Sequence, residues 1–267
     1  MPDYNRKAAI FWWLAVAVGA LVLVGCLAEL AREGPMVWLQ VLLGTVFAMA
    51  AGLFPIRIAR SKNSYVAGEI FIFLLLLLLG PAAAVVAAAG EAAMAAWRSS
   101  KRWTSRLVSP ATASIAMIVA GTALGRGLAG LDAAGWSGTV ALIGAAMAAA
   151  LLYFLINALM IAGVQRLKRN EPFFQLGDLL SVFRWVGMAY AGSAAVAALL
   201  FVSYQQSGTG VLMVMLPLLA MLLVTLHLYF QQQEANELMR QANADAALRD
   251  AASAKREALV ADRKSVV

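Results

Sequence analysis

The sequence predicts an all-α fold: a polytopic integral membrane bundle of about eight transmembrane helices, with both termini in the cytosol and a cytoplasmic C-terminal helix. The first observation behind this prediction is composition. Apolar residues form 63% of the 267-residue chain and charged residues 13%, whereas soluble domains are about half apolar and about a quarter charged. The second is the alternation of apolar runs with basic clusters. The third is the position of the tryptophans near the ends of those runs.

The basic clusters orient the chain in the bilayer. Twelve of the fifteen Lys and Arg residues before position 231 fall in four clusters: Arg6-Lys7, Arg57/Arg60/Lys62, Arg98/Lys101/Arg102/Arg106 and Arg166/Lys168/Arg169. Short loops rich in Lys and Arg stay in the cytosol during insertion. Eight crossings place all four clusters there and leave Arg32 and Arg126 outside. Because the bases flank apolar runs and form no separate basic face, the net charge of +7 does not indicate nucleic-acid binding.

The first two spans are predicted at residues 8–30 and 36–54, since about 20 apolar residues cross about 30 Å of hydrocarbon. Gly34-Pro35 makes the turn between them. A second interpretation of the first span is a bacterial lipoprotein signal, because small residues precede Cys26 after a basic start and an apolar stretch. Seven further spans are unusual in a lipoprotein, so a retained span is favoured.

The next apolar run, residues 65–97, is too long for one crossing, since it would form a helix of about 50 Å. Gly80-Pro81 interrupts it, and proline cannot continue the hydrogen-bond ladder of a helix. We therefore expect two short helices, residues 65–79 and 81–97, that meet at an outer turn. They form either two full crossings or a re-entrant pair buried among neighbouring helices. One continuous helix would instead place the later basic clusters outside.

Four further spans complete the predicted bundle, at residues 108–128, 137–164, 180–204 and 210–230. Pro110 suits the first turn of the fifth span.

Residues 231–267 form a tail of different character, in which Ala, Glu, Gln, Lys and Arg dominate. These are good helix formers, so the last span is expected to continue into the cytosol. Leu238, Leu248, Ala252 and Leu259 mark a weak apolar seam. The tail is either a parallel coiled coil that joins two copies of the chain or a solvated helix.

No constellation for catalysis is present in the sequence. There is no glycine-rich phosphate loop and no His-Glu-x-x-His motif. The single histidine excludes multi-histidine metal sites. We therefore predict no enzymatic activity, no cofactor and no metal.

Two carboxyl groups inside apolar spans, Glu69 and Glu91, are the first candidate ligand-binding residues. Ionisable groups within a membrane are costly, and they face the bundle interior, pair with one another, or line a cavity. The functional interpretation is that each binds a cationic ligand or a proton. The structural alternative is that they reach toward the interface or that Glu91 pairs with Arg98.

Three more candidates complete the predicted ligand-binding set: Asn157, Arg126 and Pro217. An interhelical hydrogen bond is the ordinary role of an asparagine such as Asn157. Arg126 either pairs with Asp132 or meets an anionic ligand at the outer mouth. A kink at Pro217 would free backbone carbonyls.

Small residues four apart in the fifth span, Gly121 and Gly125, are candidate helix-packing positions, because they let another helix approach closely.

Several motifs give the chain a resemblance to a known class. They are Ser64 and Glu69 ahead of Leu79-Gly80-Pro81-Ala82, the basic residues 98–106, Leu155-Ile156-Asn157-Ala158-Leu159, and Met215-Leu216-Pro217-Leu218-Leu219. With these motifs the chain resembles the multi-span N-terminal sensor regions of bacterial signalling proteins, those that precede GGDEF, EAL, HD-GYP or histidine-kinase outputs. The likeness covers most of residues 36–235. Val108-Ser109-Pro110 stands where a Phe-Asn pair is expected. No output domain follows in this sequence, so the chain is either a stand-alone sensor or the membrane part of a longer one.

The resemblance implies a sensory or signal-input module in the bacterial inner membrane. It would bind a small ligand or respond to membrane state, and relay this through the C-terminal helix to a fused or separate output, as in cyclic-di-GMP signalling. The alternative is a small-molecule transporter or the substrate-binding membrane subunit of one, with broken helices around its site. A third interpretation is an assembly protein without a ligand. The expected partners of the chain are the lipid bilayer and a second copy of the chain.

Overall fold

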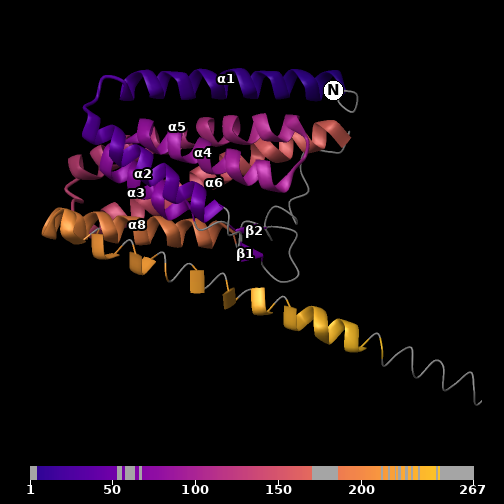
Figure 1. Cartoon of the computed structure of the whole chain (residues 1–267). Helices are drawn as coiled ribbons and strands as arrows, with labels where there is room; N and C mark the ends of the chain where they lie inside the picture. The colour runs from indigo at the N-terminus through magenta and orange to yellow at the C-terminus, as the bar shows by residue number, and fades with distance from the viewer. Residues whose placement is uncertain are drawn as a thin grey trace, which may run out of the picture.

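The computed structural model describes residues 5–52, 56–57, 64–65, 68–169 and 186–211, and most positions from 213 to 246. The described chain is almost wholly helical (Figure 1). Its helices are α1 (Arg6–Leu30), α2 (Pro35–Gly52), α3 (Glu69–Leu79), α4 (Pro81–Ser99), α5 (Trp103–Ala133), α6 (Thr139–Arg169) and α8 (Met188–Ser207). Between α2 and α3, β1 (Ile56–Arg57) pairs antiparallel with β2 (Ser64–Tyr65). Helical stretches follow from Thr209.

Four of these helices are long and apolar enough to cross a membrane: α1, α5, α6 up to Lys168, and α8. Shorter apolar helices occur at Pro35–Ala51, Glu69–Leu79 and Thr209–Leu219. At 11 residues, α3 is about 16 Å long and cannot cross about 30 Å of hydrocarbon alone. The helical prediction and the membrane prediction therefore hold in this broader form.

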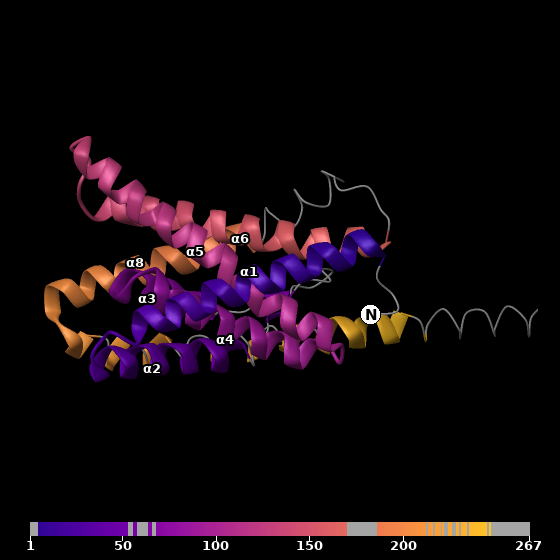
Figure 2. The ribbon, with the colours of Figure 1, turned by 90° about the horizontal axis from the view of Figure 1, so that it is seen from above.

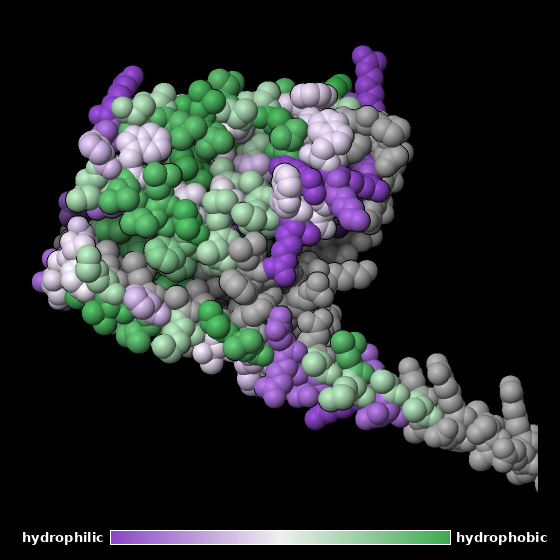
Figure 3. Space-filling view, in the orientation of Figure 1, coloured by the Kyte–Doolittle hydropathy of each residue, from purple (hydrophilic) through white to green (hydrophobic). Residues whose placement is uncertain are grey.

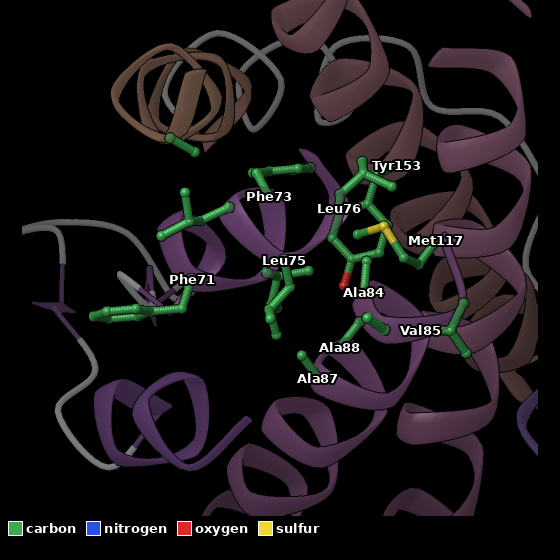
Figure 4. Packing of buried hydrophobic residues seen from close by; sticks show 14 of the residues in the cluster. Phe71, Phe73, Leu75, Leu76, Ala84, Val85, Ala87, Ala88, Met117 and Tyr153 are labelled. Carbon is green, nitrogen blue, oxygen red and sulfur yellow. The ribbon is translucent and has the colours of Figure 1, made fainter. Parts of the chain in front are cut away.

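The short helix α3 lies at the centre of the core. It packs against α2, α4 and α8, and every residue from Glu69 to Leu76 is buried. This explains its sequence, because a helix that is apolar all round is one surrounded by protein or lipid. Figure 4 shows Leu75 of α3 pointing toward the small side chains of α4, among them Ala87 and Ala88. Alanines on α4 let α3 approach it closely.

The predicted break at Gly80-Pro81 separates α3 from α4. Gly80 has a φ of +87°, which residues with a Cβ rarely adopt. Its N–H donates to the carbonyl of Leu76 at 3.1 Å and closes α3. Pro81 is the first residue of α4, where a missing N–H costs nothing.

Three boundaries differ from the sequence prediction. The third helix begins at Glu69 and not at residue 65, because Ser64–Tyr65 is paired with Ile56–Arg57. The fifth helix begins at Trp103, so Pro110 lies inside the helix and not in its first turn. Residues 180–185 of the seventh predicted span and residues 247–267 of the tail lie outside the described residues.

The outer surface of the bundle carries many exposed apolar side chains. On α1, Trp12 and Gly19 face inward, whereas Leu14, Val18 and Leu21 are exposed. Figure 2 shows α1 lying over α5 and α4, with which it is in contact. Figure 3 shows hydrophobic side chains over much of one face of the bundle, with hydrophilic ones gathered toward its ends. Such a surface suits a hydrocarbon environment, since apolar patches of this extent are rare in water.

Candidate functional site

Two buried carboxyl groups lie together inside the apolar bundle. Glu69 is 3% exposed and Glu91 is 6% exposed. Glu69 is eleven residues before Gly80 and Glu91 is eleven residues after it. Because α3 and α4 fold back on each other at Gly80, this equal spacing places the two residues at the same level of the hairpin. The structure therefore unites the two strongest candidates of the sequence.

The contact at Gly68 shows how closely Glu91 approaches the start of α3. A Cβ built on Gly68 would lie 3.1 Å from Oε1 of Glu91 and 2.8 Å from the carbonyl oxygen of Ala48. Gly68 immediately precedes Glu69, so the Glu91 carboxyl group lies against the N-terminal end of α3. The lack of a side chain at Gly68 makes room both for this carboxyl group and for the backbone of α2.

Two tyrosines from later helices complete the group. The hydroxyl of Tyr190, on α8, donates a hydrogen bond to the Glu69 carboxyl group. Tyr153, on α6, is 2% exposed and interacts electrostatically with both carboxyl groups. The rings of Tyr153 and Tyr190 are 5.8 Å apart, and Tyr153 also meets Phe73 of α3 at 6.0 Å. Glu69, Glu91, Tyr153 and Tyr190 form what we term the carboxyl–tyrosine cluster.

Three buried side-chain oxygens among the described residues have no hydrogen-bond partner: Oε2 of Glu69, Oγ1 of Thr45 and Oδ1 of Asn157. Thr45, on α2, packs against Gly90, next to Glu91. Asn157 follows Tyr153 by four residues on α6 and so lies on the same side of that helix. The interhelical hydrogen bond expected of its carbonyl oxygen is not formed within the described residues. Buried polar atoms are normally satisfied, so each of these three oxygens is unusual.

Within the described residues, no Lys or Arg forms an ion pair with either carboxyl group. Arg98, the expected partner of Glu91, is exposed. A pair of acidic side chains without a basic neighbour is an expensive arrangement in an apolar interior. The cluster is therefore the part of the bundle whose residues are least explained by packing alone.

The other two ligand-binding candidates do not join the cluster. Arg126 is exposed near the far end of α5, about 33 Å along the helix from Thr104 in its first turn. It forms no ion pair with Asp132 among the described residues. Pro217 is exposed in the helical stretch after Thr209. The two candidate helix-packing residues, Gly121 and Gly125, also differ from each other in their surroundings. A Cβ on Gly121 would lie 2.9 Å from Leu76, whereas one on Gly125 would meet no atom within 4 Å.

An open cleft of about 430 Å³ lies at the other end of α8. It is bordered by the turn between α5 and α6, with Asp132 and Trp136, and by Gln205 and Gln206 of α8. Tyr190 is about 22 Å along α8 from Gln205. This cleft was not predicted from the sequence, because its residues come from two turns that are far apart in the chain.

The basic ends of three helices are joined by hydrogen bonds. The side chain of Asn5 donates to the carbonyl of Leu167 at 2.7 Å, and the indole N–H of Trp12 donates to the carbonyl of Thr104 at 3.0 Å. Residues beside three of the four basic clusters thus meet at one end of the bundle. Trp12 is fully buried, so it packs α1 on α5 and does not serve as an interfacial anchor.

Comparison with protein-family models, with curated proteins and with solved structures gave no match to this chain.

Proposed function

We propose that the chain is a signal-input module of the bacterial inner membrane, which senses a small ligand or the state of the membrane and passes the signal to a cytoplasmic output domain or partner. The observation that carries this proposal is the carboxyl–tyrosine cluster. Ionisable groups inside a membrane usually mark a functional site, because stability alone is better served by apolar side chains. The output is of the kind found in cyclic-di-GMP signalling.

The route of the signal begins at the hydrogen bond between Tyr190 and Glu69. Tyr190 stands near the start of α8, and α8 leads through Gly208 into the helical stretch that extends beyond the bundle (Figure 1). A ligand that alters the cluster changes the contact of α3 with α8. Such a device requires two arrangements of similar free energy and a ligand that prefers one of them. A helix that runs out of the membrane then carries the displacement to the output.

The proposed topology has both termini in the cytosol, with eight crossings if the α3–α4 hairpin spans the bilayer and six if this hairpin is re-entrant. It is supported by the meeting of Asn5 with Leu167 and of Trp12 with Thr104 at one end of the bundle. The short α3 does not disturb this scheme. If α3 and α4 form a re-entrant pair, the chain still leaves the pair on the side where it entered, so the later basic clusters remain cytoplasmic.

Inserting residues into the helical stretch that follows Thr209 tests whether this stretch relays the signal. A reporter domain that is active as a dimer is joined after Val267, and residues are inserted after Gln241. Two inserted residues rotate the following helix by about 200°, whereas seven rotate it by only about −20°. We expect the two-residue insertion to change reporter output and the seven-residue insertion to preserve it. Equal output from both insertions and the parent chain would contradict a helical relay.

Transport of a small molecule is the second candidate function. It is supported by the positions of two features at opposite ends of one helix, α8. They are the open cleft beside Gln205 and the carboxyl–tyrosine cluster. Uptake of labelled amines and amino acids into liposomes that contain the chain would distinguish it from sensing. Flux that is lost in Glu69→Gln would favour transport.

A further inference from the structure

The surroundings of the cluster can stabilise one negative charge, but not two. Glu69 is the first residue of α3, where the backbone N–H groups give the helix a positive end. Glu91 lies in the interior of α4 and reaches the same end of α3 beside Gly68. One helix terminus and one hydroxyl group, that of Tyr190, therefore serve two carboxyl groups.

No basic side chain on the packed elements supplies the missing positive charge. α2 contains no ionisable residue, and neither does α5 between Leu107 and Gly125. Between Lys7 and Glu29, the only ionisable residue of α1 is Cys26. α6 and α8 contribute the phenols Tyr153 and Tyr190 to the cluster. Among the described residues, the groups that face the two carboxyls are thus neutral or acidic.

The unpartnered atoms provide a second and independent indication. In the described part of the chain, three buried atoms lack a hydrogen-bond partner; all three are oxygens, and one of them belongs to Glu69 itself. Oxygen atoms without a partner attract cations. A buried anion in the site would instead face two carboxyl groups, and a neutral apolar ligand would leave the oxygens unsatisfied.

We infer that Glu69 and Glu91 together hold one monovalent cation, either a proton shared by the two carboxyl groups or an alkali metal ion. This inference names the ligand of the proposed sensor, so its signalling role rests on the proposed function, while the binding itself does not. A bound cation would tie α3 to α4 and leave the Tyr190 hydroxyl in place on Glu69. Its loss would set two carboxylates against each other and loosen the contact of α3 with α8.

Thermal unfolding of the purified full chain in lipid nanodiscs tests the binding directly. A cation that binds only the folded state stabilises it in proportion to the logarithm of its concentration. In choline chloride, which offers no alkali ion, the unfolding temperature should fall by several degrees from mildly acidic to mildly alkaline buffer. If sodium or lithium chloride restores it, the ion is an alkali metal; if neither salt acts, the ion is the proton.

Amide variants identify the residues. Glu69→Gln and Glu91→Gln each keep the shape of the side chain and remove one negative charge, so each should abolish the dependence on pH and on alkali ions. Glu29→Gln, at an exposed position of α1, should retain the behaviour of the parent chain. The inference is overturned if the parent chain responds to neither pH nor alkali ions, or if both cluster variants respond as it does.

Infrared difference spectra of the parent chain provide a test that needs no variant. Between acidic and alkaline buffer, or on addition of sodium, the carboxyl bands should change, and unchanged bands overturn the inference. Neither measurement uses the reporter. A chain that binds the cation but ignores insertions after Gln241 would refute the proposed relay and leave the cation site intact.

Discussion

The hydrogen bond from Tyr190 to Glu69 joins the acidic pair to α8. A buried carboxyl group that loses a donor keeps its desolvation cost without the compensating bond. We therefore expect Tyr190→Phe to lower the free energy of unfolding by about 1–3 kcal/mol and to change reporter output. The free energy is measured by denaturant titration in detergent.

Tyr204→Phe supplies the matched control, because Tyr204 is a tyrosine at the other end of the same helix. Its stability should stay within about 0.5 kcal/mol of the parent chain. Equal losses in the two variants would mean that the hydroxyl of Tyr190 contributes nothing particular to the site.

Part of the site was predictable at the residue scale. Glu69 and Glu91 stand out as acidic residues in apolar runs, and their equal spacing about Gly80 could have predicted their pairing. Tyr153 and Tyr190 could not be found in this way. Tyrosines also occur as interfacial residues, and the contact of Tyr153 and Tyr190 with the carboxyl groups depends on how α6 and α8 pack, across more than 60 residues of chain.

At the scale of elements, glycine decides how closely α1 can lie on α5. A Cβ on Gly19 would lie 2.5 Å from both Cα and the carbonyl oxygen of Ala111. These are backbone atoms, so the clash cannot be relieved by a rotamer change. We expect Gly19→Ala to cost about 1–3 kcal/mol of stability through overpacking. The thermal unfolding temperature in detergent measures the loss.

Gly25 provides the comparison on the same helix. A Cβ on Gly25 would meet no atom within 4 Å. Alanine is the better helix former, so Gly25→Ala should be neutral or slightly stabilising. If both alanine variants behaved alike, the close approach of α1 and α5 would not be a determinant of stability.

The sequence predicted the elements better than their ends. Apolar length and the Gly80-Pro81 break gave the helices that the structure has, since both are local properties. The start of α3 at Glu69 was missed, because Ser64–Tyr65 finds a partner in Ile56–Arg57. The start of α5 was also misplaced. Its first residues are polar, and they become helical through contacts such as that of Arg106 with the Ser100 carbonyl at 2.9 Å.

For the whole molecule, the basic clusters and the turns divide the bundle into two ends. Asn5, Leu167 and Thr104 meet at one end. The turns at Gly34, Gly80, Gly135 and Gly208 each follow a helix that runs away from that end. This arrangement agrees with the rule that Lys and Arg remain on the cytoplasmic side. The charge pattern of the sequence predicts the side of the membrane on which each end lies, and that assignment remains a prediction.

Topology reporters test this division. Alkaline phosphatase, which is active only after export, should be inactive when joined after Ser100 and active when joined after Gly135. A cytoplasmic fluorescent protein at the same two positions should give the opposite pattern. We expect this because basic residues such as those at 98–106 keep a loop in the cytosol during insertion, whereas the turn at Gly135 carries no base. Phosphatase activity after Ser100 would place the Glu91 end of α4 outside. The carboxyl–tyrosine cluster would then open toward the periplasm, and a cation sensed there would be an external one.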